Sequence, residues 1–323
     1  MGTPEFACQP LGHLCQSRHE VVAVVTGADK PSGRGRKTHP TPVCQAAVCA
    51  NVRVIRAAKL KDQALYDQIE ALKPDLFVVI AFRILPQKLI DLPRLGAMNI
   101  HASLLPKYRG AAPINWALIN GEKETGLSSF LLKRKVDTGD VILQEAIPIE
   151  DDDNFDSLHD RLCEKAGPFL LKTLDLIEKG NVPLMIQDDS LATPAPKITP
   201  FDAMIDFGFP AAKVADFVRG LSSRPGAFTY FRGSKLKILK AVAVSEETLA
   251  ATADAATTPG TTRPGTIIRA RKKLLVACSD STLELLQVVP QGKKAMDGQS
   301  FLNGFKPQVG EILGEITMGA KEN

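Results

Sequence analysis

The chain of 323 residues is poor in aromatic side chains and has no long apolar run. Aromatic residues make up 6% of the sequence, and it contains no stretch of about 18 apolar residues, the usual minimum for a membrane-spanning helix. The first residues also lack the basic start and the apolar block of a secretory signal peptide. We therefore expect a cytoplasmic protein without a membrane partner.

Cysteine occurs six times, at positions 8, 15, 44, 49, 163 and 278, but no two cysteines form a C-x-x-C pair. This spacing argues against a zinc site and against a disulfide framework. It is typical of reduced, partly buried thiols in a reducing compartment. We expect no metal site.

Charge is distributed unevenly along the chain. Residues 208–323 contain 16 Lys and Arg and 10 Asp and Glu, a net charge of +6, whereas residues 1–207 contain 24 basic and 26 acidic residues, a net charge of −2. A basic region beside a near-neutral one favours a polyanionic partner, although ordinary solvated surface would give the same count.

The most informative segment begins with Asn99-Ile-His101. Its two polar residues flank one residue, so on a strand both side chains lie on the same face. Residues 95–100 are mostly apolar, as in a buried parallel strand, and catalytic groups commonly lie where such strands end. An isolated pair of this kind more often satisfies only backbone groups, but the long segment up to Pro113 and a downstream carboxylate favour catalysis.

The carboxylate comes from residues 136–140, Val-Asp-Thr-Gly-Asp. An amide can donate to a developing oxyanion, an imidazole can take a proton from an amine, and a carboxylate can orient the imidazole. Acyl transfer to an amine requires these three roles. The residues alone leave open whether Asp140 or Asp137 orients the imidazole, or whether both only shape a turn.

The first part of the chain alternates strands and helices, which predicts a Rossmann-like α/β domain with a parallel sheet. The expected strands are residues 20–26, 75–82, 95–100, 127–132 and 141–149, and the expected helices are residues 41–50, 61–72 and 154–179.

The last part has a helical pattern at residues 211–221, followed by short strands with turn signals that favour a small β-barrel. Residues 187–200 are rich in Asp, Ser, Thr and Pro, as a linker is. We expect a catalytic domain at residues 1–186, a linker at 187–203 and a C-terminal β-barrel domain at 204–323. The expected strands are residues 227–231, 236–243, 266–270, 273–278 and 282–289.

Several segments together resemble the methionyl-tRNA formyltransferase family, within the wider group of transferases that use 10-formyltetrahydrofolate. The resemblance covers nearly the whole chain and implies an OB-like form for the C-terminal barrel. The segments are GTPEFA at 2–7, DKPSGRGR at 29–36, NIHASLLPKYRGAAPINWALINGEKETG from Asn99, VDTGD at 136–140, KIT at 197–199 and PQGKKAM at 290–296.

The resemblance implies transfer of a formyl group from 10-formyltetrahydrofolate to the α-amine of methionyl initiator tRNA, by a monomer. It assigns catalysis to Asn99 as oxyanion donor, His101 as base and Asp140 as the carboxylate that orients His101. The residues expected to bind the folate are Phe82, Arg83, Leu85, Ser103, Leu104, Leu105 and Pro106, and those expected to bind tRNA are Arg34, Arg36, Lys37 and Lys197.

Two other functions stay open. One is formyl transfer to a small amine, such as a purine ribotide or an amino-sugar nucleotide, by the same catalytic residues. The other is an inactive RNA-binding relative. The second follows from a departure at the N-terminus, because family members carry an apolar strand before the Gly-Thr-Pro-Glu-Phe turn, whereas Met1 directly precedes Gly2 here. We expect that a central strand is missing and that Met1 is an internal residue of a longer natural chain.

Overall fold

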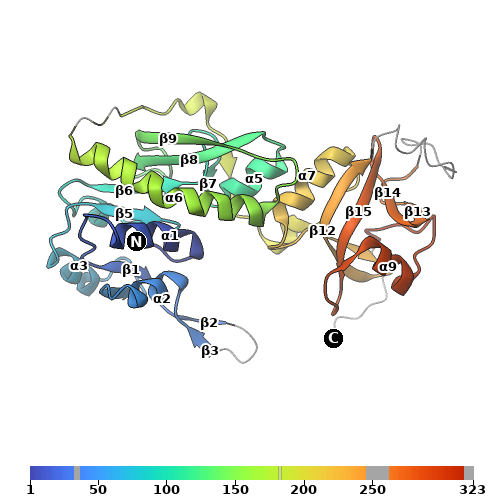
Figure 1. Ribbon diagram of the computed structural model, residues 1–323, viewed down its shortest axis with the longest axis horizontal. Helices are drawn as coiled ribbons and strands as arrows, with labels where there is room; N and C mark the ends of the chain where they lie inside the picture. Colours follow the sequence, from blue (N-terminus) through green and yellow to red (C-terminus); the bar gives the residue numbers. More distant parts are fainter. Residues whose placement is uncertain (33–36, 181, 183, 245–261, 316–323) are drawn as a thin grey trace. The chain divides into compact units, whose positions relative to one another are not determined.

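The computed structural model describes residues 1–32, 37–180, 182, 184–244 and 262–315. These residues form two compact units, each with its own core (Figure 1). The first unit comprises Met1–Pro113, Glu124–Pro148 and Ser157–Pro196, and the second comprises Ile114–Lys123, Ile149–Asp156 and Lys197–Asn323.

The first unit alternates helices and strands, as its sequence predicts. Helix α2 begins after Thr41, whose side chain accepts the backbone N–H of Cys44, and Pro42 occupies its first position, so both usual start signals are used. The elements are η1 (Glu5–Ala7), α1 (Cys8–Cys15), β1 (Val24–Gly27), β2 (Lys30–Ser32), β3 (Lys37–His39), α2 (Pro42–Cys49), β4 (Val54–Ala57), α3 (Gln63–Glu70), β5 (Phe77–Ile80), α4 (Gln87–Ile90), β6 (Ala97–His101), β7 (Arg109–Gly110), β8 (Glu124–Leu131), β9 (Val141–Pro148), α6 (Phe155–Glu178), η2 (Asp189–Leu191) and β10 (Pro194–Ala195).

The main sheet of this unit has the strand order β5-β6-β8-β9. Strands β5 and β6 are parallel, and so are β1 and β4, which confirms the parallel arrangement predicted for the first part of the chain. Strands β8 and β9 are antiparallel to their neighbours. For β8 and β9 the short connection between them explains this direction, since a parallel pair needs a longer crossover.

The sheet is interrupted between β1 and β5. Among the described strands, β1 pairs only with β4, and a cavity of about 830 Å³ lies between residues 19–25 and residues 72–78. Met1 and Gly2 fill only one end of this gap: Gly2 N–H donates to the Val25 carbonyl at 3.1 Å, and Ile80 N–H donates to the Met1 carbonyl at 2.9 Å. The expected central strand is therefore absent from the described sheet, and β1 begins at Val24 rather than at residue 20.

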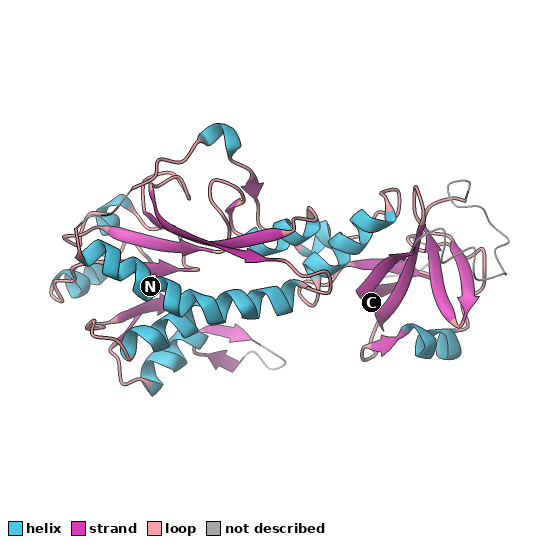
Figure 2. Ribbon diagram, turned by 45° about the horizontal axis from the view of Figure 1, so that its top comes forward, coloured by secondary structure: helices cyan, strands magenta, loops and turns pink. Residues whose placement is uncertain are grey.

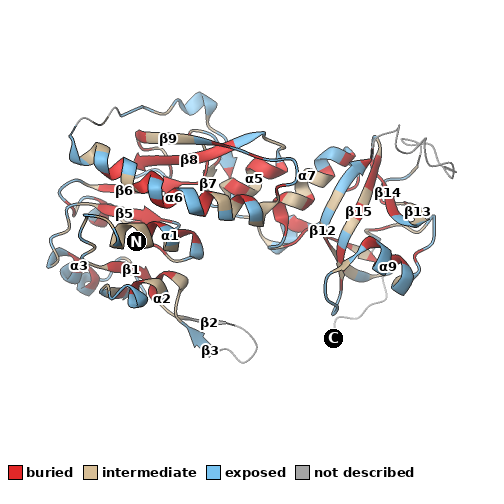
Figure 3. Cartoon of the chain, in the orientation of Figure 1, coloured by how far each residue is buried: buried red, intermediate tan, exposed pale blue. Residues whose placement is uncertain are grey.

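The long helix α6 covers the main sheet, and its apolar stripe is buried as its periodicity predicts (Figure 3). Thr173 also joins this contact, because its hydroxyl donates to Ser129 Oγ on β8 at 3.0 Å. The buried apolar residues of the stripe are Leu158, Leu162, Ala166, Phe169, Leu170 and Leu174.

The second unit contains a curled antiparallel sheet with the strand order β11-β12-β15-β14-β13, and β16 pairs with β15 (Figure 2). Bulges near Lys240 interrupt the register of β12, and such bulges bend a strand. The sheet is the half-barrel form of the small β domain that the sequence predicts. Its elements are α5 (Pro113–Ile119), η3 (Pro200–Ala203), α7 (Ala211–Leu221), β11 (Phe228–Phe231), β12 (Ser234–Val244), β13 (Ile267–Arg271), β14 (Lys273–Ala277), β15 (Thr282–Pro290), β16 (Met296–Asp297) and α9 (Gly298–Phe305).

The predicted linker at 187–203 is not a separate segment in the structure. Its first part belongs to the first unit, because β10 pairs with β7 and the Tyr108 N–H donates to Thr193 Oγ1 at 2.8 Å. Residues from Lys197 onward belong to the second unit, which also includes residues 114–123 and 149–156. Among the described residues, no helix is both long and apolar enough to cross a membrane.

Candidate active site

Strand β6 positions the two polar side chains that the sequence singles out. It lies between β5 and β8, so Asn99 is opposite Val79 and Phe130, and His101 is opposite Ser128. Because β5 and β6 are parallel, the loops that follow them leave the sheet at the same edge, where sites form in such sheets.

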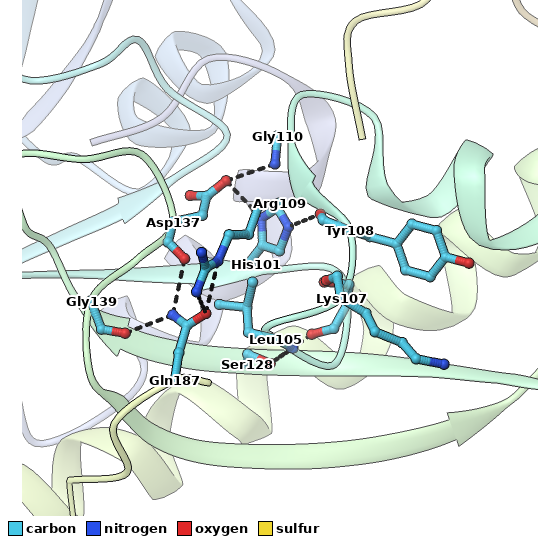
Figure 4. Close-up of polar contacts among 11 residues, drawn as sticks. His101, Leu105, Lys107, Tyr108, Arg109, Gly110, Ser128, Asp137, Gly139 and Gln187 are labelled. Atoms are coloured by element: carbon cyan, nitrogen blue, oxygen red, sulfur yellow. Dashed lines mark hydrogen bonds and ion pairs between the residues drawn. The ribbon is translucent and has the colours of Figure 1, made fainter. Parts of the chain in front are cut away.

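The His101 imidazole is buried, with one ring nitrogen in a hydrogen bond and the other facing a carboxylate (Figure 4). Its Nε2 is 2.8 Å from the Tyr108 carbonyl oxygen. A carbonyl oxygen only accepts hydrogen bonds, so Nε2 carries the hydrogen in this contact and the neutral ring has its lone pair on Nδ1. Nδ1 is 3.9 Å from Oδ2 of Asp137, a carboxylate that is also buried.

The carboxylate that the structure places beside His101 is that of Asp137 and not that of Asp140, which the sequence resemblance indicates. Asp140 Oδ1 is 2.7 Å from Lys133 Nζ, in a partly exposed ion pair. The backbone of Asp137 explains the difference: its φ of 54° is left-handed, and its carboxylate accepts the Gly110 N–H at 2.9 Å. Both aspartates lie in one turn sequence, so the residues alone could not separate them.

Asn99 has a side chain with no hydrogen bond to any other described residue, and its Oδ1 is buried. A buried unpartnered polar atom is rare in folded proteins and calls for an explanation. Here the amide is two residues before His101 on the same strand face.

The loop at residues 103–106, expected to bind the folate, is fixed against β8 and β9. Ser128 Oγ donates to the Ser103 carbonyl at 2.6 Å and accepts the Leu105 N–H at 3.0 Å, while Gln144 Nε2 donates to the Leu105 carbonyl at 2.8 Å. Ser103 and Leu105 are buried, whereas Leu104 and Pro106 are half-buried. Leu105 therefore packs in the core with Phe130 and Val141, and Leu104 and Pro106 keep surface for a ligand.

The other expected folate residues follow β5. Leu85 belongs to the core of the first unit, and the half-buried Phe82 packs against that core. The Arg83 guanidinium donates to the Ala58 carbonyl at 2.9 Å and lies over the Phe82 ring. Phe82 and Arg83 are thus held in place at the sheet edge, and Leu85 serves packing.

Two residues that the sequence did not single out complete the polar network of the site (Figure 4). Gln187 Oε1 accepts from the guanidinium of Arg109 at 2.8 and 3.0 Å, and its Nε2 donates to the carbonyls of Asp137 and Gly139. Arg109 is part of the motif after Asn99, but Gln187 lies in a segment with linker composition, which carries no signal for this contact.

The expected tRNA residues are only partly described. Arg34 and Arg36 lie outside the described residues, between strands β2 and β3 of a hairpin. Lys37 is the first residue of β3, and its side chain is not described. Lys197 is exposed at the start of the second unit's main segment.

Among the described residues, one group has metal-ligand chemistry: His19, Asp175 and Glu178. Arg18 already forms ion pairs with both carboxylates, including Asp175 at 2.7 Å. The large cavity between β1 and β5 is lined by none of the predicted catalytic or folate residues. All six cysteines are free thiols, as expected, and burial raises the pKa of Cys163 to about 12.

Comparison with known proteins connects this arrangement to a reaction class. Residues 1–174 match the family model "Formyl transferase", and residues 197–306 match "Formyl transferase, C-terminal domain". A Geobacter sulfurreducens protein named methionyl-tRNA formyltransferase is 42% identical over 317 residues, covering 98% of this chain and 96% of that protein. A protein of the same name from Caldanaerobacter subterraneus is 39% identical over 315 residues, covering 97% of this chain and 98% of its own length.

A solved structure supports the fold. The Helicobacter canadensis N-formyltransferase, in complex with folinic acid and dTDP-3-aminofucose, has a TM-score of 0.63 and 16% identity. The likeness covers 88% of this chain and 96% of that protein. At this identity the likeness establishes the shared architecture only.

Proposed function

The chain belongs to the formyl transferase family, and from that premise we propose that it transfers the formyl group of 10-formyltetrahydrofolate to the α-amine of methionyl initiator tRNA. The observation that supports the reaction class is the position of Asn99 and His101 on one face of β6, with Asp137 at 3.9 Å from His101. An oxyanion donor, a base and a carboxylate beside that base are the three groups that acyl transfer to an amine uses.

The residues act in one sequence. As the amine attacks the formyl carbon, its proton passes to His101 at Nδ1, the ring nitrogen that has a free lone pair. The resulting imidazolium is stabilised by the Asp137 carboxylate and by the Tyr108 carbonyl. The side-chain N–H of Asn99 donates to the formyl oxygen while negative charge develops there. The tetrahedral intermediate then collapses: the bond between the formyl carbon and N10 of the folate breaks, the imidazolium returns its proton to N10, and tetrahydrofolate leaves.

The sheet edge fits a flat heterocycle with an aromatic ring and hydrogen-bonding edges. Half-buried Phe82, Leu104 and Pro106 offer apolar surface. Ile84, in the loop between Phe82 and Leu85, is 74% exposed. Pockets for such ligands combine apolar walls with a few fixed polar groups. The hydrogen bonds of Ser128 and Gln144 hold the 103–106 backbone in one conformation, so it can serve as a rigid wall.

The identity of the amine follows from the relatives and from charge. The relatives named methionyl-tRNA formyltransferase match both parts of the chain, and residues 208–323 have a net charge of +6. A basic domain attracts a polyanion such as tRNA, whereas an amino-sugar nucleotide or a purine ribotide carries far less charge. The chemistry of the site alone fits all three amines.

A formylation assay with three acceptors tests this proposal. Labelled 10-formyltetrahydrofolate is supplied with methionyl initiator tRNA, with an amino-sugar nucleotide or with a purine ribotide amine. We expect rapid labelling of the tRNA alone. Preferential labelling of a small amine would replace the tRNA substrate, and binding of tRNA without any turnover would identify an inactive RNA-binding relative.

A further inference from the structure

The side-chain amide of Gln187 uses its full hydrogen-bonding capacity inside the site (Figure 4). Oε1 accepts from Arg109 Nε at 3.0 Å and from Arg109 Nη2 at 2.8 Å. Nε2 donates to the Asp137 carbonyl at 2.9 Å and to the Gly139 carbonyl at 2.7 Å. An amide offers two N–H donors and two lone pairs, so none is left for a substrate.

The partners fix which way round this amide lies. A guanidinium only donates and backbone carbonyls only accept, so the oxygen must face Arg109 and the nitrogen must face the turn. Arg109 is itself held by Asp189, at 2.8 Å from its Nη2. The amide therefore forms a rigid link between Arg109 and the turn at residues 137–139.

The turn at residues 137–139 has little room to move toward β8. A Cβ on Gly139 would be 1.5 Å from the Leu131 carbonyl oxygen, so the turn already lies tight against β8. Asp137 has left-handed backbone torsions, which a non-glycine residue adopts at a cost. A conformation of this kind persists only when its surroundings hold it, and the two hydrogen bonds from Gln187 lie on either side of the turn.

The link through Gln187 also reaches the residues around the Asp137 carboxylate. Asp137 Oδ2 accepts from the N–H of Gly110, the residue after Arg109, and the same oxygen is 3.9 Å from His101 Nδ1. Gln187 thus binds the backbone of Asp137 and the side chain of Arg109. Arg109 directly precedes Gly110, whose N–H donates to the Asp137 carboxylate.

We propose that Gln187 is a positioning residue for formyl transfer, which holds the 137–139 turn so that the Asp137 carboxylate faces His101. The inference rests on the proposed function, because it gives His101 and Asp137 their roles in that reaction. Gln187 touches neither substrate nor any reacting atom in this scheme, and it acts through Asp137 alone.

Two substitutions distinguish the hydrogen bonds of Gln187 with Arg109 from those with the carbonyls of Asp137 and Gly139. Gln187→Met removes all four hydrogen bonds at similar size. Gln187→Glu keeps an acceptor for Arg109 but places a second acceptor against the carbonyls of Asp137 and Gly139. If the turn is what matters, both variants lose activity, whereas a role through Arg109 alone would leave Gln187→Glu active.

We expect both variants to lower the single-turnover formylation rate on the order of 10–100-fold, the usual effect of a group that orients an imidazole–carboxylate pair. The KM values for tRNA and for formylfolate should change much less. Gln45→Glu, an exposed position on α2, is the matched control and should keep the wild-type rate. In an Asp137→Asn background, Gln187→Met should cause no further loss, because residues that act as a unit are not additive.

The chemical shifts of the His101 ring, measured by NMR at one pH, give a readout that does not depend on turnover. Gln187→Met should change them, because the Asp137 carboxylate is no longer held beside Nδ1. Unchanged shifts together with a wild-type rate would overturn the inference, and so would an equal loss from Gln187→Met in the wild-type and Asp137→Asn backgrounds. A wild-type chain that does not formylate methionyl-tRNA would instead refute the proposed function, while the NMR comparison would still decide the role of Gln187.

Discussion

Two regions of the first unit differ in how their strands and loops are held together. At the end of β6, polar groups are dense and joined by hydrogen bonds, from His101 and Tyr108 to Asp137, Gly110 and Gln187. Between β1 and β5, a largely apolar cavity of about 830 Å³ separates backbone edges that a strand would pair. Hydrogen bonds hold the first region in one geometry. The second region lacks the strand pairing that would connect β1 to β5.

The comparison separates chemistry from stability. The proposed catalytic groups and the residues that contact them come from β6, β8 and the loops at residues 102–110, 137–139 and 187, none of which lines the cavity. Changes in the site should therefore alter the rate far more than the folding free energy. Changes at the gap should alter stability and leave the rate of the folded molecules nearly constant.

The largest expected effect on rate is that of His101→Ala. Removing the base should lower single-turnover formylation by about 10²–10⁴-fold. The unfolding free energy should fall by only about 1–3 kcal/mol, because one buried carbonyl loses its partner. Rapid-quench kinetics and thermal melts of the same sample check both, and a variant with near-normal rate would eliminate His101 as the base.

A pair of matched substitutions compares the two aspartates of the turn. Asp137→Asn should lower the formylation rate on the order of 10–100-fold, because the imidazolium loses its carboxylate. Asp140→Asn should stay within a few-fold of the wild type, since it only removes a partly exposed pair with Lys133 worth about 0–1 kcal/mol. The reverse order of effects in single-turnover assays would restore Asp140 as the catalytic partner.

The smallest expected effect lies in the second unit. Lys197→Ala should weaken binding of methionyl initiator tRNA a few-fold and reduce the slope of log K against log salt by about 1, if the lysine contacts one phosphate. Folate binding should not change. Lys59→Ala, an exposed lysine of the first unit, is the control, and identical salt slopes for both variants would remove Lys197 from the tRNA contact.

Local patterns predict the elements well, because they depend on nearby residues. The stripe of α6, the start of α2 at Thr41 and the strand that carries Asn99 and His101 all lie as their sequence indicates. The antiparallel pairing of β8 and β9 was not predicted, because strand direction depends on which edges meet in the folded sheet.

The site could be predicted only in part, for a similar reason. Asp137 and Asp140 differ little as sequence positions, and the backbone torsions of the turn decide which carboxylate faces His101. The link through Gln187 joins segments far apart in the chain, so no local pattern contains it.

A double-mutant cycle tests the central claim most directly, namely that His101 and Asp137 act as one unit in formyl transfer. The single-turnover rate is measured for the wild type, His101→Ala, Asp137→Asn and the double variant, with methionyl initiator tRNA and 10-formyltetrahydrofolate at saturation. We predict that the double variant is no slower than His101→Ala alone, because the carboxylate acts only through the imidazole. A double variant slowed by the product of the two single effects would contradict the account.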